Sequence, residues 1–246
     1  MRTSNPILQN KFFETTTRTS SEVMTVRGTV NKTLIMLGLV VVAAAYTWGK
    51  FAAMGASAIT PFLIGGAIGG LVLGLVTIFK QDWARITAPA YAICQGLFIG
   101  GLSATLDAQY PGVVIQAVGL TFGTMFCLLG AYLSGLISVT EKFRAGLLSA
   151  MGGLIVFYIA TFVMGLFGVD TSFMSGGGIF SIGLSLVVVV IAALNLVLDF
   201  DFIDTATRNR APKNMEWIGA FGLMVTLIWL YIEILRLLTK LSQRRD

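Results

Sequence analysis

Four acidic residues lie in or directly after the last two apolar runs of this chain, and their side chains are the best placed to do chemistry. Asp199, Asp201 and Asp204 follow one another at spacings of two and three residues where one run ends, and Glu233 lies inside the final run. Placing an acid at the middle of a membrane helix costs about 2.5 to 3.5 kcal/mol, so such a residue marks a functional site. A carboxyl group there can bind a proton or, when ionised, offer oxygen ligands to a hard divalent cation.

The elements that position these acids follow from the composition. Of the 246 residues, 56% are hydrophobic and only 12% are charged, and the mean hydropathy is +0.84, which is too few charges to cover a soluble domain. Runs long enough to cross a bilayer begin and end near residues 33–48, 56–79, 86–106, 112–138, 145–168, 179–203 and 217–238. The sequence therefore predicts an all-α, polytopic membrane helix bundle with seven transmembrane helices.

The predicted organisation is a single transmembrane domain between two polar tails. Residues 1–32 form a polar, cytoplasmic N-terminal tail, residues 33–238 form the seven-helix domain, and residues 239–246 form a basic C-terminal tail. The basic residues gather in the N-terminal tail and in alternate connections, which predicts a cytoplasmic N-terminus. The basic C-terminal tail disagrees with this count, because seven spans would place it outside. The side of the C-terminus is therefore left open.

Several classes of function are excluded by residues that are missing or badly placed. The net charge of +5 comes from the tails and connections, so it does not indicate a nucleic-acid surface. The chain has no histidine, which removes Ser-His and Cys-His catalysis and histidine metal sites. An intramembrane aspartyl protease needs two facing aspartates and a Gly-x-Gly-Asp loop, and the sequence has no such loop. We expect no enzyme, no resident metal and no cofactor.

The helical period relates the acids of the sixth run to their neighbours. Asn195 stands four residues before Asp199 on the same face and can donate a hydrogen bond to it. Asp201 lies about 200° around the helix from Asp199, so the two cannot face the same seam. Asp201 and Asp204 are then either supporting groups or interface acids paired with a basic residue of the following connection, Arg208 or Arg210.

The final run places one basic residue close to its acid. Arg236 follows Glu233 by three residues on the same face, where it can neutralise that acid locally or extend to the bilayer surface. We therefore take Asp199 and Glu233 as the candidate pH-sensing or ion-pathway residues. Asn195, Asp201 and Arg236 are the candidate supporting residues.

The sequence resembles the Bax inhibitor-1 family of seven-helix membrane proteins. The segments Asp199–Ile203 and Leu230–Glu233 carry the family resemblance. Three further segments, Met1–Pro6, Gly28–Thr33 and Ala211–Trp217, are similar to its bacterial YccA-like branch. The resemblance implies a bundle with the last helix central and, in some members, a pH-sensitive calcium leak gated by an aspartate pair on the sixth and seventh helices. It places Asp199 and Glu233 at those two positions.

Two departures from the family pattern bear on that pair. Glutamate stands in place of the second aspartate, and the segment between the two acids is about ten residues longer. At 1.5 Å per residue, an insertion inside the helices would move the acids apart in depth by about 15 Å, whereas an insertion in the connection would leave them level. Two carboxyl groups that did meet in a dry interior would form a pH switch, because desolvation and like charge both oppose the second ionisation.

The leading prediction is a pH-sensitive cation leak, with calcium as the transported ion. The alternative is a non-conducting membrane regulator that binds other membrane proteins, such as a membrane-bound protease. Both place the chain in a lipid bilayer, and the branch resemblance implies a bacterial inner membrane. Neither involves nucleic acid.

Overall fold

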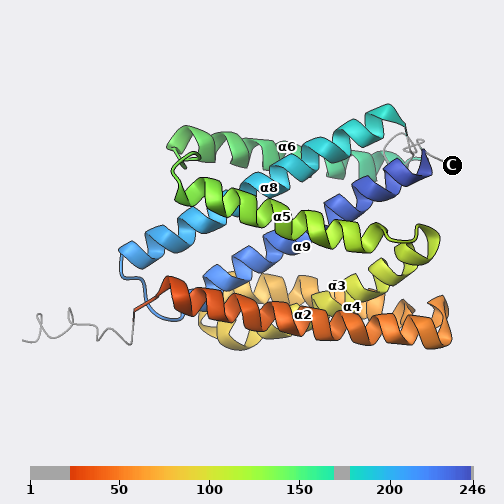
Figure 1. Cartoon of the computed structure of the whole chain (residues 1–246), viewed down its shortest axis with the longest axis horizontal. Coiled ribbons are helices and arrows are strands. Elements are labelled where there is room, and N and C mark those ends of the chain that lie inside the picture. Colours follow the sequence, from red (N-terminus) through yellow and green to blue (C-terminus); the bar gives the residue numbers. More distant parts are fainter. Residues whose placement is uncertain (1–22, 169–177, 245–246) are drawn as a thin grey trace, which may run out of the picture.

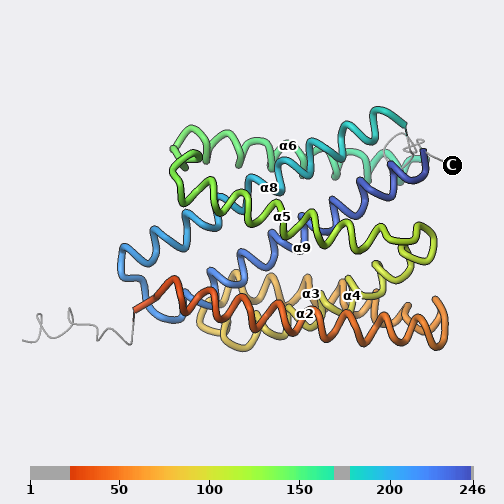
Figure 2. The backbone as a smooth tube through the Cα atoms, viewed as in Figure 1, coloured from red at the N-terminus to blue at the C-terminus, as the bar shows by residue number. Residues whose placement is uncertain are grey.

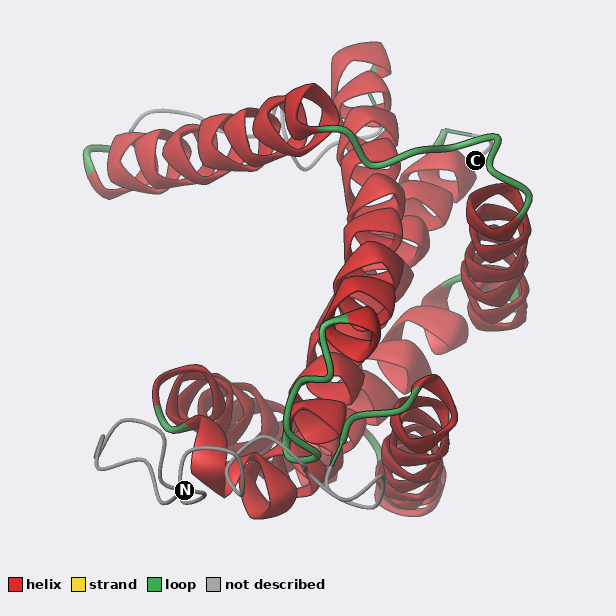
Figure 3. Cartoon of the chain, turned by 90° about the vertical axis from the view of Figure 1, so that its left-hand side faces the viewer, coloured by secondary structure: helices red, strands yellow, loops and turns green. Residues whose placement is uncertain are grey.

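The computed structural model describes residues 23–168 and 178–244, and within these ranges it contains seven helices long and apolar enough to cross a membrane (Figure 1). The helices are α2 (Val26–Met54), α3 (Ala56–Phe79), α4 (Ala84–Gln109), α5 (Val113–Leu133), α6 (Glu141–Leu166), α8 (Ile179–Arg208) and α9 (Met215–Gln243). A short 3-10 helix, Gln81–Trp83, precedes α4. Every regular element in these residues is helical (Figure 3), so the predicted seven-helix, all-α fold is confirmed.

Helix α9 is the centre of the bundle. Its most apolar segment is 67% buried, whereas that of α6 is only 6% buried. It packs against α2, α4, α5 and α8, and Figure 1 shows it running diagonally between the α2–α4 group and the α5–α6–α8 group. Two-thirds of the residues in that segment are buried by protein, which confirms the prediction that the last helix is central.

Successive helices alternate in direction, so the bundle has two distinct ends. The Glu216 end holds the starts of α2, α4, α6 and α9, and the Lys240 end holds the starts of α3, α5 and α8 together with the end of α9. The backbone can be followed from one end to the other in Figure 2. Helices α8 and α9 form an antiparallel hairpin whose connection is only residues 209–214.

The first and last helices extend beyond their predicted limits into both tails. Helix α2 begins at Val26 rather than near residue 33, and the Thr25 hydroxyl caps it by accepting a hydrogen bond from the Gly28 amide at 3.0 Å. Helix α9 continues to Gln243 rather than ending at 238. Polar residues at both ends pack against protein, which is why hydropathy alone places these limits too far inward. Residues 1–22 of the expected N-terminal tail lie outside the described residues.

Close packing between helices depends on glycine in α4. A Cβ at Gly96 would lie 2.5 Å from the Val40 carbonyl oxygen of α2, and a Cβ at Gly100 would overlap the Ala44 backbone. Small residues at such crossings allow two membrane helices to approach backbone to backbone. Helices α2 and α4 therefore form a tight pair, against which α9 packs.

Candidate functional site

Asp199 lies on α8 and faces the central helix α9. Its Oδ2 atom is buried and accepts no hydrogen bond from the described residues. A Cβ at Gly222 of α9 would lie 3.5 Å from Oδ1, and the Thr226 hydroxyl, one turn further along α9, faces the same carboxyl group. Asp199 is thus an acid in a seam between two helices, with a hydroxyl group as its polar neighbour and no ion pair among the described residues.

Asn195 does not support Asp199, which corrects the prediction drawn from their spacing. Its side-chain amide donates a hydrogen bond to the Ile191 carbonyl oxygen at 2.8 Å, within its own helix. Short polar side chains in a helix can reach the backbone carbonyl one turn earlier. That local bond turns the amide group towards the backbone of its own helix, and no hydrogen bond from it to Asp199 is formed.

Asp201 and Asp204 belong to an ionic network at the Glu216 end. Arg208 pairs with Asp204 at 2.8 Å, which confirms one predicted pair. Asp201 instead pairs at 2.9 Å with Arg144, from the first turn of α6, so its predicted pairing with Arg208 or Arg210 is wrong. The Tyr132 hydroxyl of α5 lies 3.5 Å from Asp201 and 3.4 Å from Asp204. The network joins three helices and leaves Asp199 outside it.

Glu233 is held in a local ion pair. Its side chain is only 6% exposed, and the Arg236 guanidinium donates to both carboxylate oxygens, at 3.2 and 3.3 Å. The pairing confirms local neutralisation by Arg236. Lys240 and the Tyr158 hydroxyl lie near the same charges. Glu233 therefore stands in a positively charged neighbourhood rather than beside another acid.

The structure does not bring Asp199 and Glu233 together. Asp199 is level with Gly222 and Thr226, and Glu233 lies seven positions beyond Thr226, which is about 10 Å further along α9. The connection between α8 and α9 is only residues 209–214, so most of the chain between the two acids is helical. Each acid therefore has its own surroundings, Asp199 towards the Glu216 end and Glu233 towards the Lys240 end.

A third buried acid, Glu216, lies at the start of α9 and was not among the residues predicted from the sequence. Its side chain is 2% exposed and forms an ion pair with Lys32 of α2, while the amide and the hydroxyl of Thr25 each donate to it at 3.0 Å. Lys32 also lies 5.3 Å from the centre of the Trp217 ring. A Cβ at Gly28 would overlap the Glu216 carboxylate, so only glycine leaves room for it.

A signal for this contact was present in the sequence. Lys32 and Glu216 are opposite charges at the inner limits of the first and last runs, and a seven-span topology with a central last helix puts both at the same end of the bundle. Both also lie in segments that are similar to the YccA-like branch. The sequence does not show that α2 and α9 are neighbours in the bundle.

The bundle and its buried acids define a class of polytopic membrane protein in which a carboxyl group of the sixth span faces a central seventh span. A comparison with known families also identifies the family of this chain within that class. The family described as Bax inhibitor 1 like matches residues 5–243, and the chain belongs to this family. A search of the curated proteins finds no relative that matches it. The YccA-like branch stays a prediction.

Proposed function

We propose that this protein is a pH-sensitive cation leak, with calcium as the transported ion and Asp199 as the sensor. The observation that supports this most is the buried Oδ2 atom of Asp199, which accepts no hydrogen bond from the described residues. A neutral carboxylic acid is tolerated in a dry seam, whereas a carboxylate requires water, a hydrogen-bond donor or a cation. Ionisation of Asp199 would therefore favour entry of water and cations between α8 and α9.

Glu233 has a different part in this proposal. Arg236 already pairs with it, and Lys240 adds a second positive charge nearby, so its carboxylate is a poor ligand for a divalent cation. In this proposal the Glu233–Arg236 pair keeps the Lys240 end of the same seam closed. A cation that enters from the Glu216 end would meet the ionised carboxylate of Asp199 first, and a cation from either end would pass Glu233 only if the pair with Arg236 opened.

The test is calcium flux into liposomes that contain the purified protein and a calcium-sensitive dye. We expect flux above that of empty liposomes, rising with pH as Asp199 ionises, and we expect Asp199→Asn to remove that pH dependence. Asp204→Asn is the matched control, because it removes a carboxylate that is paired with Arg208 at the bundle surface. Wild-type flux equal to that of empty liposomes at every pH would rule out the proposal.

A second candidate function is a non-conducting regulator that binds a membrane protein. It is favoured by α6, whose most apolar segment is 6% buried and whose packing is mainly against α8. Exposed apolar residues lie on this helix at Ile155, Val156, Ile159 and Phe162. A photo-crosslinker at Ile159 that captures a membrane-bound protease equally well from wild type and from Asp199→Asn would favour this function over the leak.

A further inference from the structure

A pocket of about 430 Å³ lies beside the central helix, between α3, α4 and α9. Its volume is within the range of about 300 to 1,000 Å³ that is typical of small-molecule sites. Helices α3 and α9 both pack against α4 and hardly against each other, so the pocket opens to the bilayer between them. Asp199 does not line this pocket, so a ligand bound there would be independent of the proposed leak.

Tyr91 of α4 presents an unpaired hydroxyl group to this pocket. The residue is only 6% exposed, and its ring packs edge to face on Phe221 of α9 with the ring centroids 5.0 Å apart. Its hydroxyl group makes no hydrogen bond with the described residues, and the only fully enclosed side-chain atom among them that lacks a partner is Asp199 Oδ2. The Tyr91 hydroxyl must therefore reach the open space of the pocket that it lines. Buried hydroxyl groups usually have a hydrogen-bond partner, so the fold leaves this one for a ligand.

Gln95 adds a second neutral polar group one turn further along α4. A spacing of four residues puts it on the same helix face as Tyr91, and it lines the pocket without a hydrogen bond to the described residues. Two glycines of α3 leave room for these side chains. A Cβ at Gly70 would lie 2.6 Å from the Gln95 amide nitrogen, and one at Gly74 would lie 3.5 Å from the Tyr91 ring. Helix α3 therefore approaches both polar groups closely and bonds to neither.

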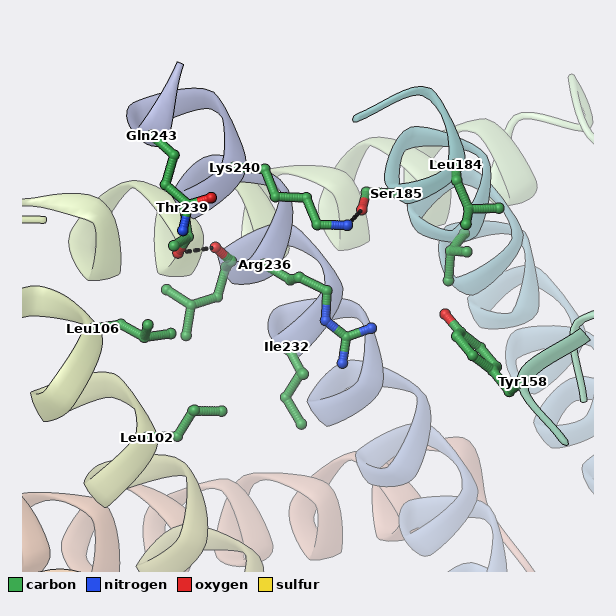
Figure 4. A pocket seen from close by; sticks show the side chains of 12 residues that line it. Leu102, Leu106, Tyr158, Leu184, Ser185, Ile232, Arg236, Thr239, Lys240 and Gln243 are labelled. Atoms are coloured by element: carbon green, nitrogen blue, oxygen red, sulfur yellow. Dashed lines mark hydrogen bonds between the residues drawn. The ribbon is translucent and has the colours of Figure 1, made fainter. Parts of the chain in front are cut away.

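Among the described residues that line this pocket, none is charged. The pocket at the Lys240 end differs in this respect, because Arg236 and Lys240 are part of its wall (Figure 4). The wall between α3, α4 and α9 is otherwise aliphatic and aromatic, its rings belonging to Tyr91, Phe98, Phe221 and Trp229. A charged ligand would lack a partner there, whereas a flat, neutral group packs well against aromatic rings.

The two polar groups lie too deep for the headgroup of a phospholipid. Tyr91 and Gln95 stand seven and eleven positions after Ala84, the first residue of α4, which places them about 10 and 16 Å along the helix. The hydrocarbon core of a bilayer is about 30 Å thick, so Gln95 lies near its middle. A ligand that reaches both groups must carry its own polar atoms into the hydrocarbon. A neutral carbonyl compound can do so, and a phosphate cannot.

We propose that this pocket binds the head of a membrane-soluble quinone. Carbonyl oxygens only accept hydrogen bonds, and the Tyr91 hydroxyl and the Gln95 amide both have hydrogens to donate. The flat ring of the quinone lies against the aromatic wall. Its hydrocarbon tail leaves between α3 and α9, along exposed aliphatic side chains of α3 at Leu71, Leu75 and Ile78. The ester carbonyls of a phospholipid share the acceptor chemistry but stay near the bilayer surface.

Native mass spectrometry of the detergent-purified, delipidated full chain tests this proposal. The probes are decylubiquinone and decylbenzene, which has the same tail on an aromatic ring without carbonyl groups, added at equal concentrations. We expect more one-ligand adduct with decylubiquinone, and a loss of about fivefold in that adduct for each of Tyr91→Phe and Gln95→Leu, because each variant removes one hydrogen bond. Dioleoyl phosphatidylcholine should displace little of the bound quinone.

Further measurements separate the pocket from general effects and from misfolding. Tyr158→Phe removes a tyrosine hydroxyl from the pocket at the Lys240 end and should keep the wild-type adduct. Ala67→Phe keeps both polar groups, narrows the pocket and should lower the adduct. Tyr91→Phe and Gln95→Leu should melt no lower than the wild type, because neither side chain has a hydrogen bond within the protein to lose.

Four results would each overturn the proposal. They are equal adducts of the two probes, the same loss of adduct in Tyr158→Phe, displacement of the quinone by the phospholipid, and a lower melting temperature of Tyr91→Phe and Gln95→Leu. The last result would show that the two polar groups serve the fold rather than a ligand.

Discussion

The ion pair between Lys32 and Glu216 is the residue-scale contact that fixes the start of the central helix. Removing one partner of a buried pair leaves an uncompensated charge and typically costs about 3 to 5 kcal/mol. We therefore expect Glu216→Gln to lower the free energy of unfolding in detergent by about 3 kcal/mol, because Lys32 would then lack its partner. Thermal unfolding in a mild detergent would measure the change.

Two variants make this prediction specific. Asp204→Asn removes an acid whose side chain is 35% exposed, and its loss should cost no more than about 1 kcal/mol. The double variant Lys32→Met, Glu216→Leu removes both charges and should recover part of the stability that Glu216→Gln loses. A Glu216→Gln protein as stable as Asp204→Asn would show that the pair contributes little.

Contacts within a single helix could be predicted from sequence, whereas contacts between helices could not. The pairs Glu233–Arg236 and Asp204–Arg208 follow from spacings of three and four residues, which place the side chains on one face. The pair of Asp201 with Arg144 depends on how α6 lies against α8, and no spacing encodes that. Asn195 shows that two residues on the same helix face need not form a hydrogen bond, because its amide donates to a backbone carbonyl of its own helix instead.

At the scale of elements, the α2–α4 crossing depends on Gly100. A methyl group there would overlap the Ala44 backbone, which cannot move aside as a flexible side chain could. We expect Gly100→Ala to lower the melting temperature, with a loss of about 1 to 3 kcal/mol from overpacking. Gly123→Ala on α5 is the matched control, because nothing lies within 4 Å of its Cβ position and alanine is a better helix former than glycine. A similar fall in both variants would contradict this account.

The hairpin of α8 and α9 could be predicted from the sequence only in part. Hydropathy located both helices, and their alternation along the chain made them antiparallel neighbours. Hydropathy could not show how the chain between the two acids is divided between the helices and the connection. The connection is limited to residues 209–214, so the two acids are separated along the helices, and Asp199 meets Gly222 and Thr226 rather than Glu233.

For the whole molecule, the family resemblance identified the central helix before packing was known, but the inner surfaces of the other helices were less predictable. Helix α6 is strongly apolar, yet only 6% of its most apolar segment is buried, while 50% of the corresponding segment of the less apolar α4 is buried. In a bilayer, apolar side chains face lipid as readily as protein, so hydropathy does not separate the two. The glycines of α4 mark its packed faces better than its apolar residues do.

The arrangement of the whole bundle also determines where the chain termini lie. Helix α2 begins at one end and α9 finishes at the other, so seven complete spans put the start of α2 and the end of α9 on opposite sides of the membrane (Figure 1). The basic residues of the alternate connections favour a cytoplasmic Glu216 end, and orientation follows such residues more closely than it follows a short C-terminal tail. We therefore predict that alkaline phosphatase fused after Asp246 is active in the periplasm of a bacterial host. Green fluorescent protein fused at the same position should not fluoresce. Fluorescence together with inactive alkaline phosphatase would mean that α9 does not cross the membrane.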